Sequence, residues 1–283
     1  MAGRRHRGST GAVTWTEQTV QVGGLDVFVR TSSPQVVGRT PIVHVHGFGI
    51  SGASLLPTAE RLGLIATNVV PDLPGHGRSA RWDRAMGIPA LAEALVELLD
   101  VLGMERVVLV GNSMGCPVSL EVAHMAPSLV ERVVLTSPAG GLHNQPLRRA
   151  MRQMLQDVPR EDPKMAAVAV PDYAKFGPVN TVNLFAELTR FPTLERLLRT
   201  AVPTLAVIGT RDPLMPPPQR VLELARMAHD DITVVIIEGA AHAVNFSHPG
   251  ELTHVIRSWL DGREIRDDPD EPGLSRVVHL PRS

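Results

Sequence analysis

The sequence predicts an α/β protein built on a wound, mostly parallel sheet, and three observations lead to this fold class. Short apolar runs rich in Val and Ile recur at wide intervals without alternating with polar residues, as in parallel strands covered on both faces. Segments with helical periodicity separate several of these runs, which is typical of crossover helices. A pair of alternating segments joined by two glycines precedes them and predicts an antiparallel hairpin.

The hairpin is the first predicted element, with strands over 19–22 and 25–30 around the Gly23-Gly24 turn. We expect it at the antiparallel edge of the sheet, and residues 1–14 before it as a mobile tail. Helices are expected over 89–102, 114–125 and 249–260, and the first and last of these carry their apolar residues on one face. The parallel strands are predicted from six apolar runs, over 41–45, 64–70, 106–110, 133–136, 204–208 and 232–237.

One long segment lacks any strand-like run. Residues 142–201 contain helical patches, and prolines at 146, 159, 163, 171, 178 and 192 are expected to cut these patches short. We interpret 142–201 as a helical cap inserted into a core made of 15–141 and 202–262. Residues 263–283 are rich in charge and proline, and we expect them to form a second mobile tail.

Length and composition narrow the class of protein. The 283 residues suffice for one large α/β domain or two modest ones, and 28 basic against 29 acidic residues argue against a nucleic-acid partner. The single cysteine, Cys116, excludes an internal disulfide and fits a reducing compartment. The basic N-terminus lacks a following apolar segment, and no apolar run reaches the ~18 residues that span a bilayer. We therefore expect a cytoplasmic, globular protein.

Ser113 lies in Gly111-Asn112-Ser113-Met114-Gly115, directly after an apolar run and before a helical segment. This arrangement predicts a nucleophile elbow, in which a sharp strand-to-helix turn exposes the serine. The turn residue is forced toward positive φ, and the residues two before and two after it must be small because backbone lies against them. Gly111 and Gly115 meet that requirement.

A serine needs a base and a third group that orients the base, and after an elbow serine the expected order is acid, then histidine. Asp212 follows the apolar run 204–208, and His242 follows the run 232–237 through a small-residue loop. Both would therefore stand at the same sheet edge as Ser113, where open α/β sheets bind their ligands. His248 is the rival histidine, but it precedes Pro249 and suits the start of the last helix better.

Two backbone N–H groups are expected to stabilise the oxyanion that forms when Ser113 attacks. One belongs to Met114, the residue after the serine. The other belongs to the segment His46-Gly47-Phe48-Gly49, which follows the run 41–45. We assign it to Phe48, with Gly49 as the alternative. The chemistry of the site calls for no metal and no organic cofactor.

The chain resembles the capped α/β-hydrolases over most of its length, from about 20 to 261. The resemblance implies an α/β-hydrolase fold in which Ser113 is the nucleophile, Asp212 orients His242, and the cap covers the pocket. It rests on five motifs in the order of that family, which are His46-Gly47-Phe48-Gly49, Asp72-Leu73-Pro74-Gly75-His76-Gly77-Arg78-Ser79, Gly111-Asn112-Ser113-Met114-Gly115, Gly209-Thr210-Arg211-Asp212 and Gly239-Ala240-Ala241-His242.

The expected reaction is hydrolysis of a small or medium carboxylic ester, or of a lactone or thioester, through an acyl-enzyme. The substrate would be a small molecule with an apolar acyl group. The elbow also resembles that of hydrolases that cleave carbon–carbon bonds in ring-cleavage products, but those carry Ser-Gly-Pro-Gly where this chain has Phe-Gly-Ile-Ser at 48–51. Acyl transfer to an alcohol, and a ligand-binding receptor on the same fold, stay open as alternatives. The sequence gives no indication of oligomeric state.

Overall fold

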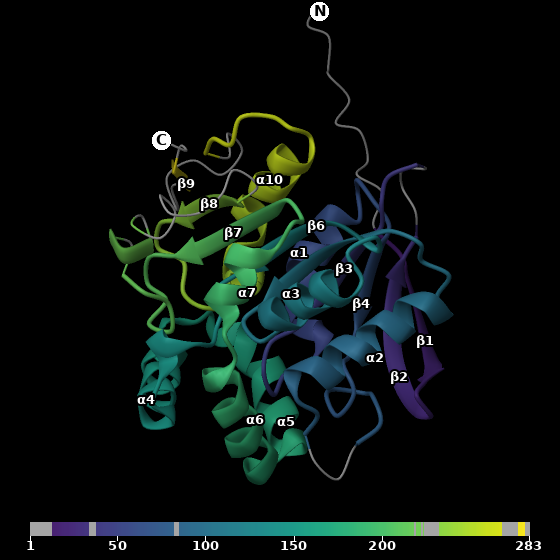
Figure 1. Cartoon of the computed structure of the whole chain (residues 1–283), viewed down its shortest axis with the longest axis horizontal. Coiled ribbons are helices and arrows are strands. Elements are labelled where there is room, and N and C mark those ends of the chain that lie inside the picture. Colours follow the sequence, from purple (N-terminus) through teal and green to yellow (C-terminus); the bar gives the residue numbers. More distant parts are fainter. Residues whose placement is uncertain are drawn as a thin grey trace, which may run out of the picture.

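The computed structural model describes residues 13–33, 38–81, 85–217, 219–221, 223, 232–267 and 277–280. Within these residues, nine strands form one sheet in the order β1-β2-β4-β3-β5-β6-β7-β8-β9 (Figure 1). The strands are β1 (Trp15–Val22), β2 (Leu25–Ser32), β3 (Ile42–Val45), β4 (Asn68–Pro71), β5 (Val107–Asn112), β6 (Val130–Thr136), β7 (Thr204–Gly209), β8 (Ile232–Ile237) and β9 (Val277–Leu280).

The sheet is mostly parallel, as the sequence predicts. Strands β4, β3, β5, β6, β7 and β8 pair with their neighbours in parallel. The hairpin β1–β2 is antiparallel and joins the sheet through an antiparallel pairing with β4. Gly23 and Gly24 have φ values of +56° and +78°, which supply the left-handed turn that joins the two strands. The predicted fold class is confirmed.

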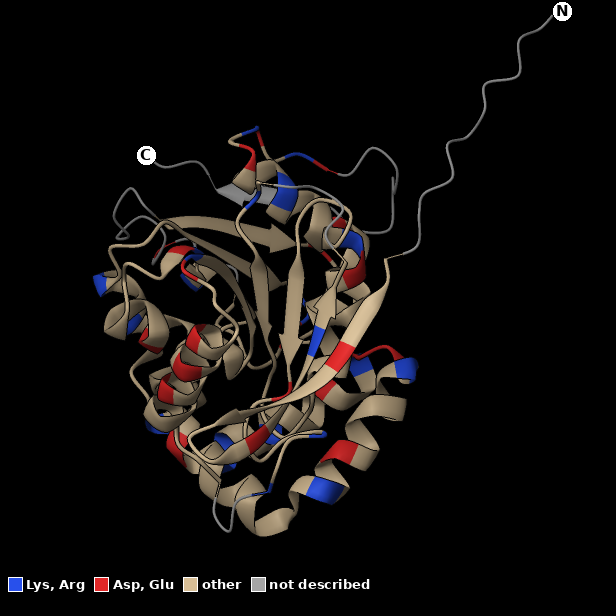
Figure 2. Ribbon diagram, turned by 90° about the vertical axis from the view of Figure 1, so that its right-hand side faces the viewer, with Lys and Arg blue, Asp and Glu red and all other residues tan. Residues whose placement is uncertain are grey.

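Helices cover both faces of the sheet. On one face, α2 (Ile88–Val101) packs beside α3 (Gly115–Met125), with Leu91, Leu95 and Leu98 buried. On the other face, α1 (Leu56–Leu62), which follows the short η1 (Gly52–Leu55), packs against α9 (Val244–Ser247) and α10 (Pro249–Leu260). This double cover explains why the central strands are apolar on both sides, and they appear largely tan in Figure 2.

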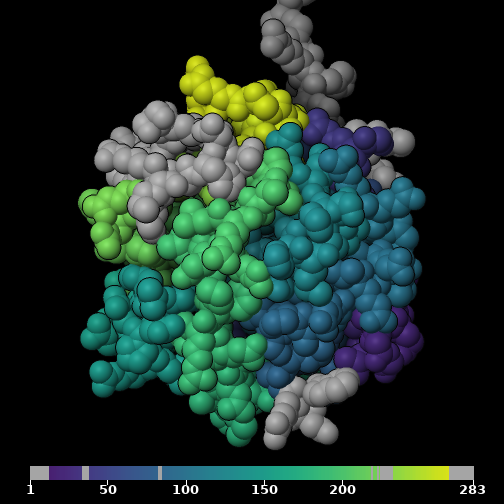
Figure 3. Space-filling model, viewed as in Figure 1, coloured from purple at the N-terminus to yellow at the C-terminus, as the bar shows by residue number. Residues whose placement is uncertain are grey.

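Between β6 and β7 the chain forms only helices. In order they are η2 (Leu142–Asn144), α4 (Leu147–Asp157), η3 (Val158–Arg160), η4 (Pro163–Met165), α5 (Ala166–Phe176), α6 (Pro178–Arg190) and α7 (Thr193–Arg199). Helices α4, α5 and α6 gather below the sheet in Figure 1, and the teal and green residues form a continuous surface with the core in Figure 3. We refer to residues 142–201 as the cap.

Three expectations differ from the structure. The strand expected over 64–70 is shorter, because residues 63–66 bond back to α1 through Ile65 N–Leu62 O and similar contacts. Pro171 lies inside α5 rather than ending it. Its ring removes one helical hydrogen bond, but both Pro171 and Ala167, whose carbonyl loses the partner, are exposed to water. Residues 277–280, expected within a mobile tail, form β9, which pairs antiparallel with β8.

Charged residues of both signs are spread over the surface helices (Figure 2). The whole chain carries a formal net charge of −1. Among the described residues, every helix is too short or too polar to traverse a lipid bilayer.

Candidate active site

Ser113 occupies a strained turn between β5 and α3. Its φ is +54°, in the left-handed region that costs energy for any residue with a side chain. The turn is fixed by a hydrogen bond from the Ser113 amide to the Thr136 carbonyl oxygen on β6, at 3.0 Å. The residue is 7% exposed. The elbow geometry predicted from the sequence is therefore present, with the side chain at the carboxyl end of the central strand.

Two glycines allow this turn. A Cβ on Gly111 would lie 2.5 Å from the carbonyl oxygen of Gly115, and a Cβ on Gly115 would overlap the carbonyl oxygen of Val45. Both neighbours are backbone atoms of β-strands or of the elbow itself, so they cannot move aside without breaking the sheet.

We expect Gly115→Ala to destabilise the fold by about 3 kcal/mol, because the added methyl group forces backbone apart in a close-packed region. Urea unfolding measures the loss. Gly103→Ala is the control, since Gly103 has a φ of +68° but open space around its Cβ position, and should cost about 1 kcal/mol. Equal losses in the two variants would contradict the steric account.

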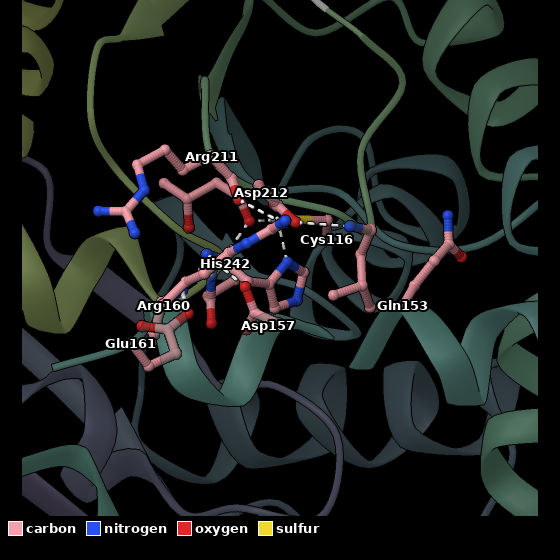
Figure 4. Close-up of polar contacts among 12 residues, drawn as sticks. Cys116, Gln153, Asp157, Arg160, Glu161, Arg211, Asp212 and His242 are labelled. Atoms are coloured by element: carbon pink, nitrogen blue, oxygen red, sulfur yellow. Dashed lines mark hydrogen bonds and ion pairs between the residues drawn. The ribbon is translucent and has the colours of Figure 1, made fainter. Parts of the chain in front are cut away.

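Asp212 and His242 meet at the same sheet edge, each just after its strand. Asp212 follows β7, His242 follows β8, and His242 Nδ1 lies 2.8 Å from Asp212 Oδ2 (Figure 4). Gly209 lets the two loops approach, because a Cβ there would overlap the Ala240 carbonyl oxygen. The rival His248 instead precedes α10, with its Nδ1 2.9 Å from Ser247 Oγ.

The electrostatics favour an ion pair between these two side chains. Burial lowers the pKa of His242. The charge and hydrogen bond of Asp212, together with the charges of Asp157 and Glu161, outweigh burial and bring the pKa to about 9. Burial raises the pKa of the Asp212 carboxyl, whereas the His242 charge and hydrogen bonds, one from the Leu214 amide at 2.8 Å, hold it below its ordinary value. In the neutral imidazole, the ionised aspartate keeps the proton on Nδ1, so Nε2 is the nitrogen that can accept the proton of Ser113.

Ser113 is linked to the histidine loop through its neighbour. The side-chain amide of Asn112 donates to the carbonyl oxygens of Thr136 at 3.2 Å and of His242 at 3.3 Å. Among the described residues, no hydrogen bond joins Ser113 Oγ to His242 Nε2. In ligand-free sites such bonds are often long and shorten when substrate binds.

The two expected oxyanion donors border the serine. A Cβ on Gly47 would lie 3.3 Å from Ser113 Cβ, so the loop 46–49 runs directly beside the elbow. Met114 stands at the N-terminus of α3, where the helix dipole favours negative charge. In the part of the chain that the structure describes, neither the Phe48 nor the Met114 amide donates to a protein acceptor.

His46 orients the peptide that carries the Phe48 amide. Its Nε2 accepts from the Leu73 amide at 2.8 Å, so the proton lies on Nδ1, which donates to the Gly47 carbonyl oxygen at 2.9 Å. Burial lowers the pKa of His46 to about 4, which keeps this neutral tautomer across the physiological range. Gly47 carbonyl and Phe48 amide belong to one peptide plane, so fixing the first fixes the second.

The cap also contacts this loop, which the sequence analysis missed. Tyr173 Oη on α5 donates to the Phe48 carbonyl oxygen at 3.1 Å, and its ring packs against Phe48 with centroids 5.9 Å apart. Asp172 Oδ2 accepts from the Ser51 amide at 2.8 Å. These partners lie more than 120 residues apart in the sequence, and no motif connects them.

Two neighbouring features lie outside the group formed by Ser113, Asp212 and His242. A cavity of about 560 Å³ opens beside it against β7, β8 and α7, lined by residues such as Ile208, Val234 and Leu198. The lining includes none of Ser113, Asp212 and His242. Cys116 lies behind the elbow with Sγ 3.3 Å from the carbonyl oxygen of Gly111, and burial raises the pKa of its thiol, as for an inert packed cysteine.

Known proteins resemble this chain in sequence and in fold. The model of the alpha/beta hydrolase family matches residues 42–255. The chain is 30% identical to Lipase LipV of Mycobacterium tuberculosis over 263 residues, which covers 84% of this chain and 99% of the relative. A bacterial membrane phospholipase A shares the fold with a TM-score of 0.75 at 23% identity, covering 88% of this chain and 86% of that one. A thermophilic esterase from Thermogutta terrifontis follows with a TM-score of 0.68 at 20% identity, covering 87% and 98%.

The family model spans more than half of the chain, and its range contains the elbow, the β7 loop and the β8 loop described above. The chain belongs to the alpha/beta hydrolase family.

Proposed function

We propose that the protein is a serine hydrolase that cleaves a small or medium carboxylic ester, or a lactone or thioester, through an acyl-enzyme. The observation that carries this proposal is the strained Ser113 elbow at the same sheet edge as the 2.8 Å contact between His242 and Asp212. The likeness to a lipase over most of both chains supports an ester substrate.

In the proposed reaction, Ser113 Oγ bonds to the substrate carbonyl carbon while its proton passes to His242 Nε2. Asp212 stabilises the imidazolium, and the Phe48 and Met114 amides hold the oxyanion. When the tetrahedral intermediate collapses, the bond to the leaving alkoxide breaks and the alkoxide takes the proton from His242. Water then gives a proton to His242 and attacks the acyl carbon. When this second tetrahedral intermediate collapses, the bond from the acyl carbon to Ser113 Oγ breaks, His242 returns the proton to Ser113 Oγ, and the acid is released.

Tyr173→Phe tests the oxyanion loop. The variant keeps the ring against Phe48 but loses the hydrogen bond to the Phe48 carbonyl, so the loop is held less firmly. We expect kcat for an ester to fall about 3- to 10-fold with little change in KM, since one neutral hydrogen bond is worth about 1 kcal/mol. Steady-state kinetics measure the change, and an unaltered kcat would show that the cap contact has no part in the reaction.

Cleavage of a carbon–carbon bond and transfer of the acyl group to an alcohol use the same nucleophile. The first needs a vinylogous diketone as substrate, and the second needs an alcohol that competes with water for the acyl-enzyme. Both can therefore be separated from ester hydrolysis by their products.

The test is a panel of p-nitrophenyl esters graded by acyl chain length, assayed with and without added alcohols and alongside a vinylogous diketone. We expect the free acid as the main product, with a clear optimum of chain length. A new ester as the main product would identify an acyltransferase, and tight binding of a small ligand without turnover would identify a receptor.

A further inference from the structure

Two carboxyl groups of the cap lie against the loop that carries His242. Asp157, the last residue of α4, accepts a hydrogen bond at Oδ1 from the His242 amide at 3.4 Å. Glu161, just after η3, accepts at Oε1 from the Ala243 amide at 2.6 Å. Figure 4 shows Asp157 beside the imidazole and Glu161 beyond Asp157. Consecutive amides of the histidine loop are thus held by one turn of the cap.

Burial raises the pKa of both carboxyl groups. Burial raises the pKa of Glu161 to about 8, with further contributions from the Asp157 charge and a hydrogen bond to Asp157. Burial also raises the pKa of Asp157, against the effect of the His242 charge. Glu161 Oε2 is buried and has no hydrogen-bond partner among the described residues. A proton on Glu161 would let that oxygen donate to Asp157 and would leave the pair with one negative charge.

We propose that Asp157 and Glu161 are positioning residues for His242: they fix the backbone of the histidine loop and hold one negative charge beside the imidazole. The proposal rests on the proposed function, in which His242 is the base. It makes the cap part of the proton-transfer machinery as well as a cover, because the imidazolium formed on attack by Ser113 is stabilised by Asp212 from the core and by Asp157 from the cap.

The groups that face this pair are few. The core loops contribute His242 and Asp212. Helix α5 contributes Tyr173, and both burial and the charge of Asp157 raise the pKa of this tyrosine. The neighbouring Arg160 points instead to the carbonyl oxygen of Arg211, at 3.1 Å. With no cation of the cap in contact with the two carboxyl groups among the described residues, the imidazole is the positive charge that they can stabilise.

The double variant Asp157→Asn/Glu161→Gln separates charge from hydrogen bonding, because the amide oxygens still accept from His242 N and Ala243 N. Asp157→Asn alone does not suffice, since loss of the Asp157 charge lowers the pKa of Glu161, which then carries the negative charge instead. A negative charge favours the imidazolium, so its removal lowers the pKa of His242. The acid limb of the pH profile of kcat/KM should then move to lower pH by about one unit. Asp162→Asn is the matched control, since Asp162 lies one residue beyond Glu161 but caps η4 through the Lys164 amide at 2.8 Å. Its acid limb should stay in place.

Glu161→Ala and Glu161→Gln test the positioning of the loop. Glutamine keeps both an acceptor for Ala243 N and a donor for Asp157, as the protonated glutamic acid does, whereas alanine keeps neither. We expect kcat to fall about tenfold in Glu161→Ala with KM nearly unchanged, and Glu161→Gln to regain most of that loss. Equal kcat values in the two variants would overturn the proposal.

An NMR titration of the histidine Cε1–H signals measures the pKa of His242 without any substrate turnover. The signal of His242 is assigned by its loss in His242→Gln. We expect the pKa of His242 to be lower in Asp157→Asn/Glu161→Gln than in the wild type and in Asp162→Asn. The same pKa in all three proteins would overturn the proposal even if esters are cleaved and Ser113→Ala is inactive. If no ester is cleaved, the proposed function fails, and the titration still tests the contact between the cap and the imidazole.

Discussion

Ser113→Ala is expected to lower kcat for the best p-nitrophenyl ester by at least about 10⁴-fold, because the variant has no hydroxyl to form the acyl-enzyme. The elbow backbone should tolerate alanine, since Ser113 already carries a Cβ at a φ of +54°. The remaining rate would come from the oxyanion donors and from binding alone. Steady-state kinetics measure the fall in kcat, and a rapid-mixing experiment shows whether any burst of p-nitrophenol release remains.

Ser119→Ala is the matched control for this variant. Ser119 lies on the same helix, α3, is fully buried, and donates its hydroxyl hydrogen to the Gly115 carbonyl oxygen at 2.7 Å. Loss of the Ser119 hydroxyl should leave kcat within about twofold of the wild-type value and lower the free energy of unfolding by about 1 kcal/mol. Ester turnover by Ser113→Ala at the level of Ser119→Ala would exclude Ser113 as the nucleophile.

Asp212→Asn is expected to lower kcat by about 10³- to 10⁴-fold. The amide lacks the charge that stabilises the imidazolium, and its NH₂ group can donate to His242 Nδ1, which moves the imidazole proton to Nε2 and blocks the base. The effect should appear in kcat more than in KM, since the interaction strengthens as the imidazolium forms.

Asp261→Asn is the comparison for this variant, because Asp261 pairs with Arg39 at 2.8 Å, Arg263 at 2.9 Å and Arg257 at 3.9 Å and not with a histidine. Its kcat should match the wild type. If both aspartate variants keep full activity, Asp212 does not orient the base.

The sequence predicts the sheet and the elbow well because both depend on local residue types. The apolar runs specify buried parallel strands, and the elbow needs Gly111 and Gly115 for close backbone approach, which the structure bears out. Strand ends are harder to predict. The expected run over 64–70 contains apolar residues that complete the turn after α1 rather than joining β4.

The contacts of the cap could not be predicted, because they depend on how distant segments dock. Asp157 meets His242 across 85 positions of the sequence, and Tyr173 meets Phe48 across 125. Neither belongs to a motif, and Asp157 and Glu161 alone would suggest a solvated turn. Strand order, in contrast, brings the loops after β7 and β8 together whatever the cap does, so the pairing of Asp212 with His242 was predictable.

Labelling with a phosphonofluoridate, followed by peptide mass spectrometry, tests most directly whether Ser113 is the reactive hydroxyl. The account predicts one covalent adduct, on the peptide that contains Ser113, with loss of ester turnover in proportion to labelling. An adduct on another residue, or undiminished turnover after Ser113 is fully labelled, would contradict it.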